Sequence, residues 1–115
     1  MRRVACALTG VAHAARCERS FQAQLLAAML VAGAIYWLRP PLLWAGLLVA
    51  MVALVLALEL VNTAIEALLD GLHPERAEFV RLAKDCAAGA VLLLSMAAVL
   101  VFVLMLLDTG IGGRS

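Results

Sequence analysis

The strongest constraint on this chain is the stretch from Leu42 to Leu58, which contains no charged and no amide side chain. A helix needs about 20 apolar residues to cross the hydrocarbon core of a bilayer, and this stretch nearly suffices. It runs directly into ELVNTAIEALLD, residues 59–70, which adds two glutamates, an asparagine and an aspartate. The chain therefore places acids where a membrane-spanning helix is about to end.

The composition of the whole chain also indicates a membrane protein. The 115 residues are 66% hydrophobic and 15% charged, whereas soluble domains average roughly 45–50% apolar and roughly 25% charged residues. One small domain cannot bury that much apolar surface, so lipid must cover part of it. We predict a single all-α membrane domain over 1–115. The net charge of +1 shows no large excess of basic residues, so we expect no nucleic-acid partner.

Three segments are long enough to span the membrane: 21–38, 42–69 and 87–107. The first ends before Arg39-Pro40-Pro41, because successive prolines interrupt a helix. The second is longer than a span requires, so its last turns are expected to emerge into water. Residues 70–86 are charged and are predicted to form a loop.

Charge bias fixes the predicted orientation. Three spans put the two termini on opposite sides, and the positive-inside rule assigns the side richer in Lys and Arg to the cytoplasm. Two of the nine cations, Arg39 and Arg114, fall on one side. The other side carries Arg2, Arg3, Arg16, Arg19, Arg76, Arg81 and Lys84. We predict a multi-pass membrane protein with its N-terminus in the cytoplasm.

Residues 1–19 have two interpretations. On a helix, Val4, Leu8 and Val11 share one face, while Arg2 and Arg16 lie on the opposite face. That pattern predicts an amphipathic helix on the membrane surface. The alternative is a secretory signal peptide, with Met-Arg-Arg, a weak apolar run and a cleavage-like Ala-His-Ala.

The acids of the second span form one stripe. Glu59, Asn62, Glu66 and Asp70 follow at i, i+3, i+7 and i+11, which places them within roughly 80° on a helix. Charges in a span are expensive and do not face lipid. One interpretation is a polar seam between helices. A second is a cation site for a hard metal such as Mg²⁺. A third is a proton-coupled carrier that uses one glutamate.

Other predicted helices bring charges to the same depth. Glu18 precedes the first span, and Lys84 and Asp85 precede the third. Carboxylates with a lysine at a membrane surface suit phosphoryl transfer, because metal and lysine neutralise phosphate while a carboxylate accepts the hydroxyl proton. The sequence has no GxxxxGK[ST] phosphate loop, which argues against a common nucleotide-binding fold.

At these residues the chain resembles a known family. ELVNTAIEALLD, a short spacer and AKDCAAGAVLL are similar to the two-part signature of the small bacterial membrane lipid kinases, which include prokaryotic diacylglycerol kinases and undecaprenol kinases. The resemblance extends from about Gly10 to Leu107. It implies a surface helix plus three transmembrane helices, assembled as a homotrimer with sites shared between subunits. It also implies transfer of the γ-phosphate of MgATP to a lipid hydroxyl at the cytoplasmic interface.

The resemblance implies roles for individual residues. Glu59 corresponds to the general base, and Asn62 to a polar residue near the transferred phosphate. Glu18 and Glu66 correspond to carboxylates that hold the metal and, with it, the ATP phosphates. The resemblance also implies four nucleotide contacts, namely Lys84, Asp85, Glu75 and Arg76. Lys84 corresponds in addition to a catalytic residue, because its charge neutralises phosphate.

Three departures from the family pattern concern the ligands. Relatives often have a histidine where this chain has Ala77, and His73 lies upstream, which affects the expected adenine contacts. Gln22 stands where a basic residue is expected. After Lys84-Asp85 the sequence CAAGAVLL is nearer the undecaprenol-kinase form. We predict a diacylglycerol kinase (ATP) that produces phosphatidic acid, with undecaprenol as the alternative lipid and a small proton-coupled carrier as the alternative of another class.

Overall fold

The computed structural model describes residues 2–73, 75 and 77–111, and these are almost entirely helical. Its elements are α1 (Arg2–Cys17), α2 (Arg19–Leu38), α3 (Leu42–Leu72) and α4 (Glu78–Leu106), with a short π-helix, η1 (Leu107–Ile111), after α4. Helices α2, α3 and α4 are each long and apolar enough to cross a membrane. The all-α membrane fold is therefore confirmed.

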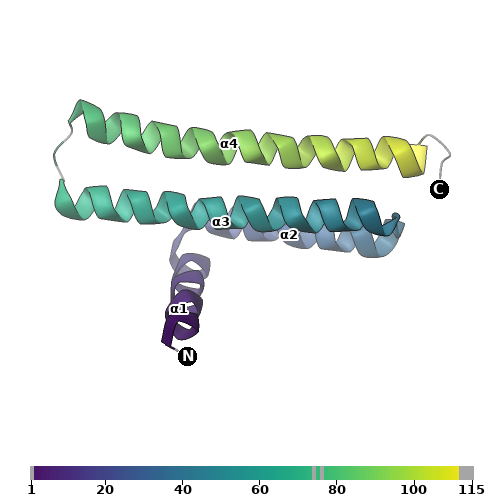
Figure 1. Ribbon diagram of the computed structural model, residues 1–115, viewed down its shortest axis with the longest axis horizontal. Coiled ribbons are helices and arrows are strands. Elements are labelled where there is room, and N and C mark those ends of the chain that lie inside the picture. Colours follow the sequence, from purple (N-terminus) through teal and green to yellow (C-terminus); the bar gives the residue numbers. More distant parts are fainter. Residues whose placement is uncertain (1, 74, 76, 112–115) are drawn as a thin grey trace.

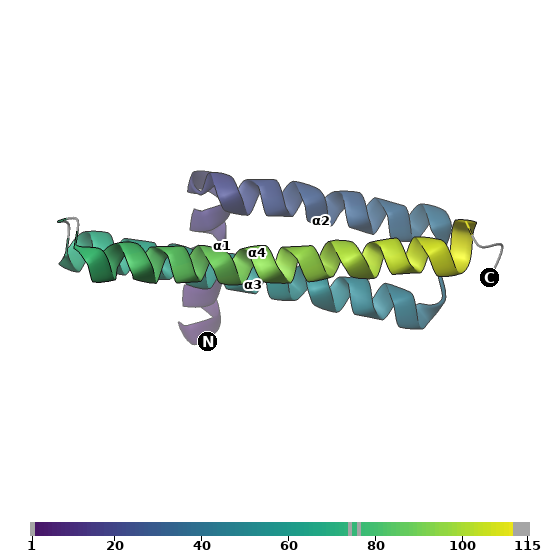
Figure 2. The same ribbon diagram turned by 90° about the horizontal axis from the view of Figure 1, so that it is seen from above.

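The three long helices form a bundle that α1 crosses. Helices α3 and α4 run antiparallel along their whole length, and α2 lies beside α3 (Figure 1). Both views show α1 running across the bundle axis near the start of α2 (Figure 2). Helix α3 has 31 residues and α2 has 20. At 1.5 Å per residue, α3 therefore extends about 16 Å farther, and its end projects with the start of α4 beyond α1.

The corner between α1 and α2 is held by backbone and side-chain hydrogen bonds. Glu18 is extended there, with φ −103° and ψ 115°. Its amide donates to the Ala14 carbonyl at 2.9 Å, and its own carbonyl accepts from the Gln22 amide at 3.0 Å. The Gln22 side chain donates through Nε2 to the carbonyls of Ala15 at 3.1 Å and Arg16 at 3.2 Å. These carbonyls belong to the last turn of α1, where intrahelical donors run out.

The turn between α2 and α3 reverses the chain within a few residues. Arg39 has a left-handed backbone, with φ 49° and ψ 57°, and its amide donates to the Ile35 carbonyl at 2.9 Å. Pro40 and Pro41 follow and cannot extend α2. The Arg39 guanidinium lies 5.6 Å from the centre of the Tyr36 ring, within reach of a cation–π contact.

A single chain buries few side chains. Phe21, Leu48 and Met105 are the largest fully buried ones, whereas Leu42 is 89% and Trp37 is 83% exposed. Exposed apolar surface on this scale requires lipid or another protein surface.

The predicted loop over 70–86 is wrong for most of its length. Helix α3 continues to Leu72 and α4 begins at Glu78, so the connection is confined to 73–77. Side-chain pairs explain the added helix, because Arg81 makes ion pairs with Glu78 and, at 2.9 Å, with Asp85. Pairs at i,i+3 and i,i+4 stabilise helical turns. The third span, predicted from residue 87, is thus part of a longer helix.

Candidate active site at the end of the bundle

The acidic stripe predicted from the sequence lies along one side of α3 and becomes more exposed toward its end. Glu59 is 4% exposed and is the only buried charged side chain in the described part of the chain. Asn62 and Glu66 are half-buried, and Asp70 is exposed. The stripe therefore leads from the packed bundle toward water.

Glu59 lies at the level where the membrane surface is expected. Counting back along the two antiparallel helices from Leu38 and Leu42 puts Glu59 level with Phe21, which is 2% exposed. Within residues 2–73, 75 and 77–111, Glu59 makes no hydrogen bond or ion pair. A buried carboxyl without a partner is unfavourable, so this side chain needs a cation, a substrate group or a second chain.

Asn62 lies almost one turn farther along the stripe and is in a similar state. Its Oδ1 atom is buried and accepts no hydrogen bond from the described residues. Because most buried polar atoms are hydrogen-bonded, the missing donor must come from outside this part of the chain. Glu59 and Asn62 together mark a place where the chain by itself is incomplete.

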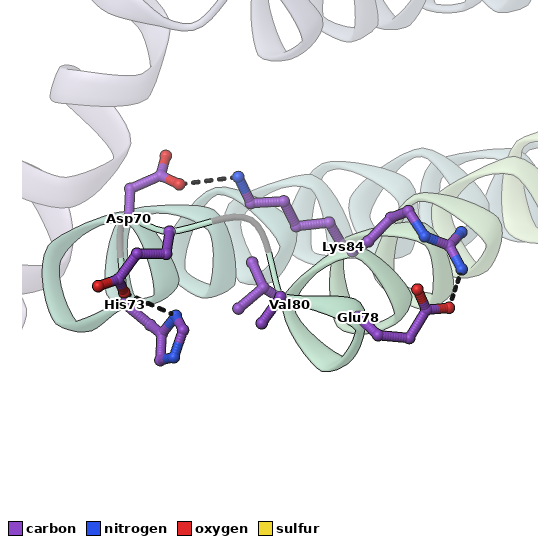
Figure 3. A pocket seen from close by; sticks show the side chains of 8 residues that line it. Asp70, His73, Glu78, Val80 and Lys84 are labelled. Atoms are coloured by element: carbon purple, nitrogen blue, oxygen red, sulfur yellow. Dashed lines mark hydrogen bonds and ion pairs between the residues drawn. The ribbon is translucent and has the colours of Figure 1, made fainter.

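A cleft of about 450 Å³ lies between the projecting ends of α3 and α4. Lys84 Nζ donates to Asp70 Oδ1 across it at 2.7 Å (Figure 3). Its lining combines carboxylates with cations, namely Asp70, His73, Glu75, Ala77, Glu78, Val80, Arg81 and Lys84. The Lys84 side chain is 34% exposed, so its ammonium group can reach a ligand in the cleft.

His73 and Glu75 shape the outer side of the cleft. The His73 ring stacks edge-on against Phe79, with centroids 4.9 Å apart. His73 Nδ1 lies 3.4 Å from Glu75 Oε1, but the contact lacks hydrogen-bond geometry. The two side chains are therefore close to each other but not hydrogen-bonded.

The structure gathers some predicted site residues and separates others. Asp70, Glu75 and Lys84 meet at the cleft, while the Asp85 carboxylate is directed to Arg81 on its own helix. Glu18 lies at the corner of α1 and α2, outside the cleft. Arg76 falls outside the described residues. Three polar lining residues, His73, Glu78 and Arg81, were not predicted as site residues. The spacing of Glu78, Arg81 and Asp85 was the available signal for the last two.

The metal prediction has weaker structural support. Among the described residues, no three His, Cys, Asp or Glu side chains come together as a group that could hold a metal ion. Glu18 and Glu66 are each half-buried and have no ion-pair partner in that part of the chain. Two free carboxylates supply hard oxygen donors, but other ligands would have to complete the set.

Comparison with known proteins decides the family. The family model for prokaryotic diacylglycerol kinase matches residues 5–106, nearly the whole chain. This chain belongs to the prokaryotic diacylglycerol kinase family. The resemblance drawn from the two-part signature is therefore confirmed.

Two relatives show how far the likeness to this kinase family extends. The diacylglycerol kinase of Synechocystis sp. is 38% identical over 96 residues, which cover 83% of this chain and 55% of that protein. The diacylglycerol kinase of Escherichia coli K12 is 33% identical over 89 residues, covering 77% of this chain and 73% of that protein. The match thus spans about half of the cyanobacterial protein's length.

Proposed function

We propose that this chain is an ATP-dependent lipid kinase that transfers the γ-phosphate of ATP to the hydroxyl of diacylglycerol, producing phosphatidic acid and ADP. Membership of the family supports the reaction class. The observation that carries the proposal is Glu59, a buried carboxyl with no partner, set at the expected level of the membrane surface. A lipid hydroxyl and a water-soluble nucleotide can meet only at that level.

In the proposed reaction Glu59 accepts the proton of the lipid hydroxyl. The hydroxyl oxygen forms a bond to the γ-phosphorus as the bond from that phosphorus to the bridging β–γ oxygen breaks, and ADP leaves. Asn62 donates its amide hydrogens to the phosphoryl oxygens. Lys84 exchanges part of its contact with Asp70 for the phosphates and neutralises their charge. A carboxylate base of this kind contributes roughly 10²–10⁴-fold to the rate.

Magnesium is the proposed metal, held by two carboxylates and completed by the substrate. Kinase sites hold Mg²⁺ through one or two carboxylates completed by substrate phosphates, and Glu18 and Glu66 are half-buried carboxylates of this kind. The bound ion would neutralise charge on the transferred phosphate. Glu75, Arg76 and Asp85 are proposed to lie against the nucleotide. Ala77 has no ring to contact the adenine, and His73 is proposed to supply that contact.

The site is proposed to be completed between subunits of a homotrimer. The unpartnered Glu59 and Asn62 and the large exposed apolar surface support contacts beyond one chain. The predicted orientation, with the N-terminus and the α3–α4 end in the cytoplasm of an inner membrane, supplies ATP on the correct side.

The purified protein in mixed micelles tests the proposal. It is given MgATP with diacylglycerol or, separately, undecaprenol, and phosphorylated lipid is measured. Transfer to diacylglycerol is expected. Faster transfer to undecaprenol would make the second lipid the substrate, in line with the CAAGAVLL segment. Transfer to neither lipid by a folded, assembled protein would contradict the kinase assignment.

A further inference from the structure

Four arginines lie on α1 and at the start of α2, and none of them forms an ion pair with an acid of the described chain. Arg2, Arg3 and Arg16 belong to α1 and Arg19 begins α2, and all four are exposed. We call them the arginine row. Helix α1 contains no Asp or Glu, and no ion pair within the described chain involves any member of the row. With one acid, Glu18, beside four arginines, the row is a net cationic surface.

Other arginines of the described chain find partners within it. Arg81 forms ion pairs with both Glu78 and Asp85, and Arg39 lies over the Tyr36 ring. Arg2, Arg3 and Arg16 differ because they lie on α1, which extends away from the bundle (Figure 1). The exposed guanidinium groups of the arginine row are available to a partner outside the chain.

The opposite side of α1 indicates what kind of surface that partner has. Val4 is 51%, Leu8 is 64% and Val11 is 41% exposed, and α1 contacts the bundle mainly near Ala14, which is 1% exposed. A helix that has an uncovered apolar face and a basic polar face, and that lies across a transmembrane bundle (Figure 1), matches the boundary between acyl chains and headgroups.

We propose that the arginine row binds the phosphate groups of anionic phospholipids in the leaflet on which α1 lies. Guanidinium groups bind phosphate through paired hydrogen bonds. Arg2 and Arg16 are 14 residues apart, or about 21 Å along the helix, so the row spans several headgroups. Each cation near an anionic surface strengthens attachment roughly five-fold. The inference does not depend on the proposed kinase activity.

Nucleotide phosphate is the weaker candidate for the same charges. The charged cleft lies between the projecting ends of α3 and α4, and no member of the arginine row lines it. The row instead follows the element that lies across the bundle at the start of α2. The position of the arginine row therefore favours lipid headgroups over a soluble nucleotide as its ligand.

Attachment of the row has a consequence for the corner. Glu18 lies between Arg16 and Arg19 in the sequence, and the hydrogen bonds of Gln22 connect the last turn of α1 to α2. Anionic lipid that holds α1 in the membrane plane therefore also restricts the position of the Glu18 carboxylate.

A spin label on α1 tests the proposal in the full-length protein. Leu8→Cys is made together with Cys6→Ser, Cys17→Ser and Cys86→Ser, and a nitroxide is attached to the new thiol. The protein is reconstituted into vesicles of phosphatidylcholine, or of equimolar phosphatidylcholine and phosphatidylglycerol. The measured quantity is the exposure of the label to a water-soluble nickel chelate as sodium chloride is increased.

We expect the label to be several-fold less exposed in the anionic vesicles, and salt to remove the difference because it screens the charges. Replacing all four residues of the row with Gln should make anionic vesicles behave like neutral ones. Replacement with Lys should retain the salt-sensitive protection. Arg39→Gln, which removes a cation at the opposite end of α2, should change nothing.

Equal exposure of the label in both vesicle types would overturn the proposal. So would an undiminished, salt-sensitive difference in the variant with four glutamines. If that variant fails to insert, the comparison of the parent protein in the two vesicle types still decides the question.

Discussion

Two levels of the bundle, one at the C-terminal end of α4 and one at the start of α2, treat their polar groups in opposite ways. At the end that carries the C-terminus, Trp44 Nε1 donates to Asp108 Oδ2 at 2.9 Å, and Thr109 Oγ1 donates to the Met105 carbonyl at 2.8 Å. At the level where α2 begins, Glu59 and Asn62 Oδ1 are buried and lack partners within the described residues. The first level satisfies its polar groups within the chain, and the second does not.

This difference separates structural polarity from functional polarity. A satisfied indole–carboxylate contact connects α3 to α4 and requires nothing from outside. A buried carboxyl without a partner destabilises the isolated chain and is retained where a ligand, a substrate or a second subunit supplies the missing group. The contrast can be tested by making the same chemical change at both levels.

The largest expected effect is on turnover. Glu59→Gln removes the proton acceptor while keeping side-chain size, so phosphate transfer should fall by about 10²–10⁴-fold. Asp108→Asn makes the same change at the other level and retains an oxygen acceptor for Trp44, so it should preserve most activity. The measurement is lipid phosphorylation at saturating MgATP, with assembly checked by size-exclusion chromatography. Near-normal turnover in Glu59→Gln would remove this residue from the chemistry.

A smaller effect is expected for the proposed metal site. Glu66→Gln removes one charged oxygen donor, so the Mg²⁺ concentration for half-maximal activity should rise by roughly ten-fold, equivalent to about 1.4 kcal/mol. The maximal rate at high Mg²⁺ should fall less. Thr63→Ser, on the same helix but outside the stripe, is the control. An unchanged Mg²⁺ requirement in Glu66→Gln would place the metal ligands elsewhere.

At the C-terminal end of α4, the expected effect is on stability alone. Trp44→Phe keeps an aromatic ring but removes the donor to Asp108, which should cost about 1–3 kcal/mol of unfolding free energy. Thermal unfolding in detergent micelles measures this change. Activity per folded molecule should be unaffected. A loss of activity without a loss of stability would show that the two levels are coupled, contrary to the comparison.

Hydropathy and charge spacing predicted most of the fold. The three long helices follow from apolar runs interrupted by Arg39-Pro40-Pro41, and the stripe follows from the i, i+3, i+7, i+11 spacing of its polar residues. These are local patterns, so a single sequence is enough to find them. The helical start of α4 was missed because its side-chain pairs are charged, and charge was interpreted as a loop.

The cleft was only partly predictable. Lys84 and Asp70 were expected at the same depth, but their 2.7 Å contact depends on how α3 and α4 pack. The contribution of His73 depends on the short connection at 73–77, which hydropathy does not define. Residues that complete the environment of Glu59 from another chain leave no pattern in one sequence beyond the unpartnered acid itself.

The smallest expected effect concerns the corner of α1 and α2. Gln22 stands where the family pattern led us to expect a basic residue, and its Nε2 donates to the Ala15 and Arg16 carbonyls. Gln22→Ala leaves those carbonyls to water and should cost about 1 kcal/mol of unfolding free energy. It should also raise the Mg²⁺ requirement a few-fold, because Glu18 is then less restricted.

Gln22→Lys distinguishes the cause of that effect. A lysine can donate to the same carbonyls, and its charge interacts favourably with the C-terminus of α1. Compared with Gln22→Ala, Gln22→Lys should therefore restore both the stability and the Mg²⁺ requirement. Lysine shares with glutamine only its length and its ability to donate hydrogen bonds. If alanine and lysine raise the Mg²⁺ requirement equally, the amide of Gln22 acts on a ligand and not on the corner. If lysine restores it, a basic residue and a glutamine perform the same structural task at this position.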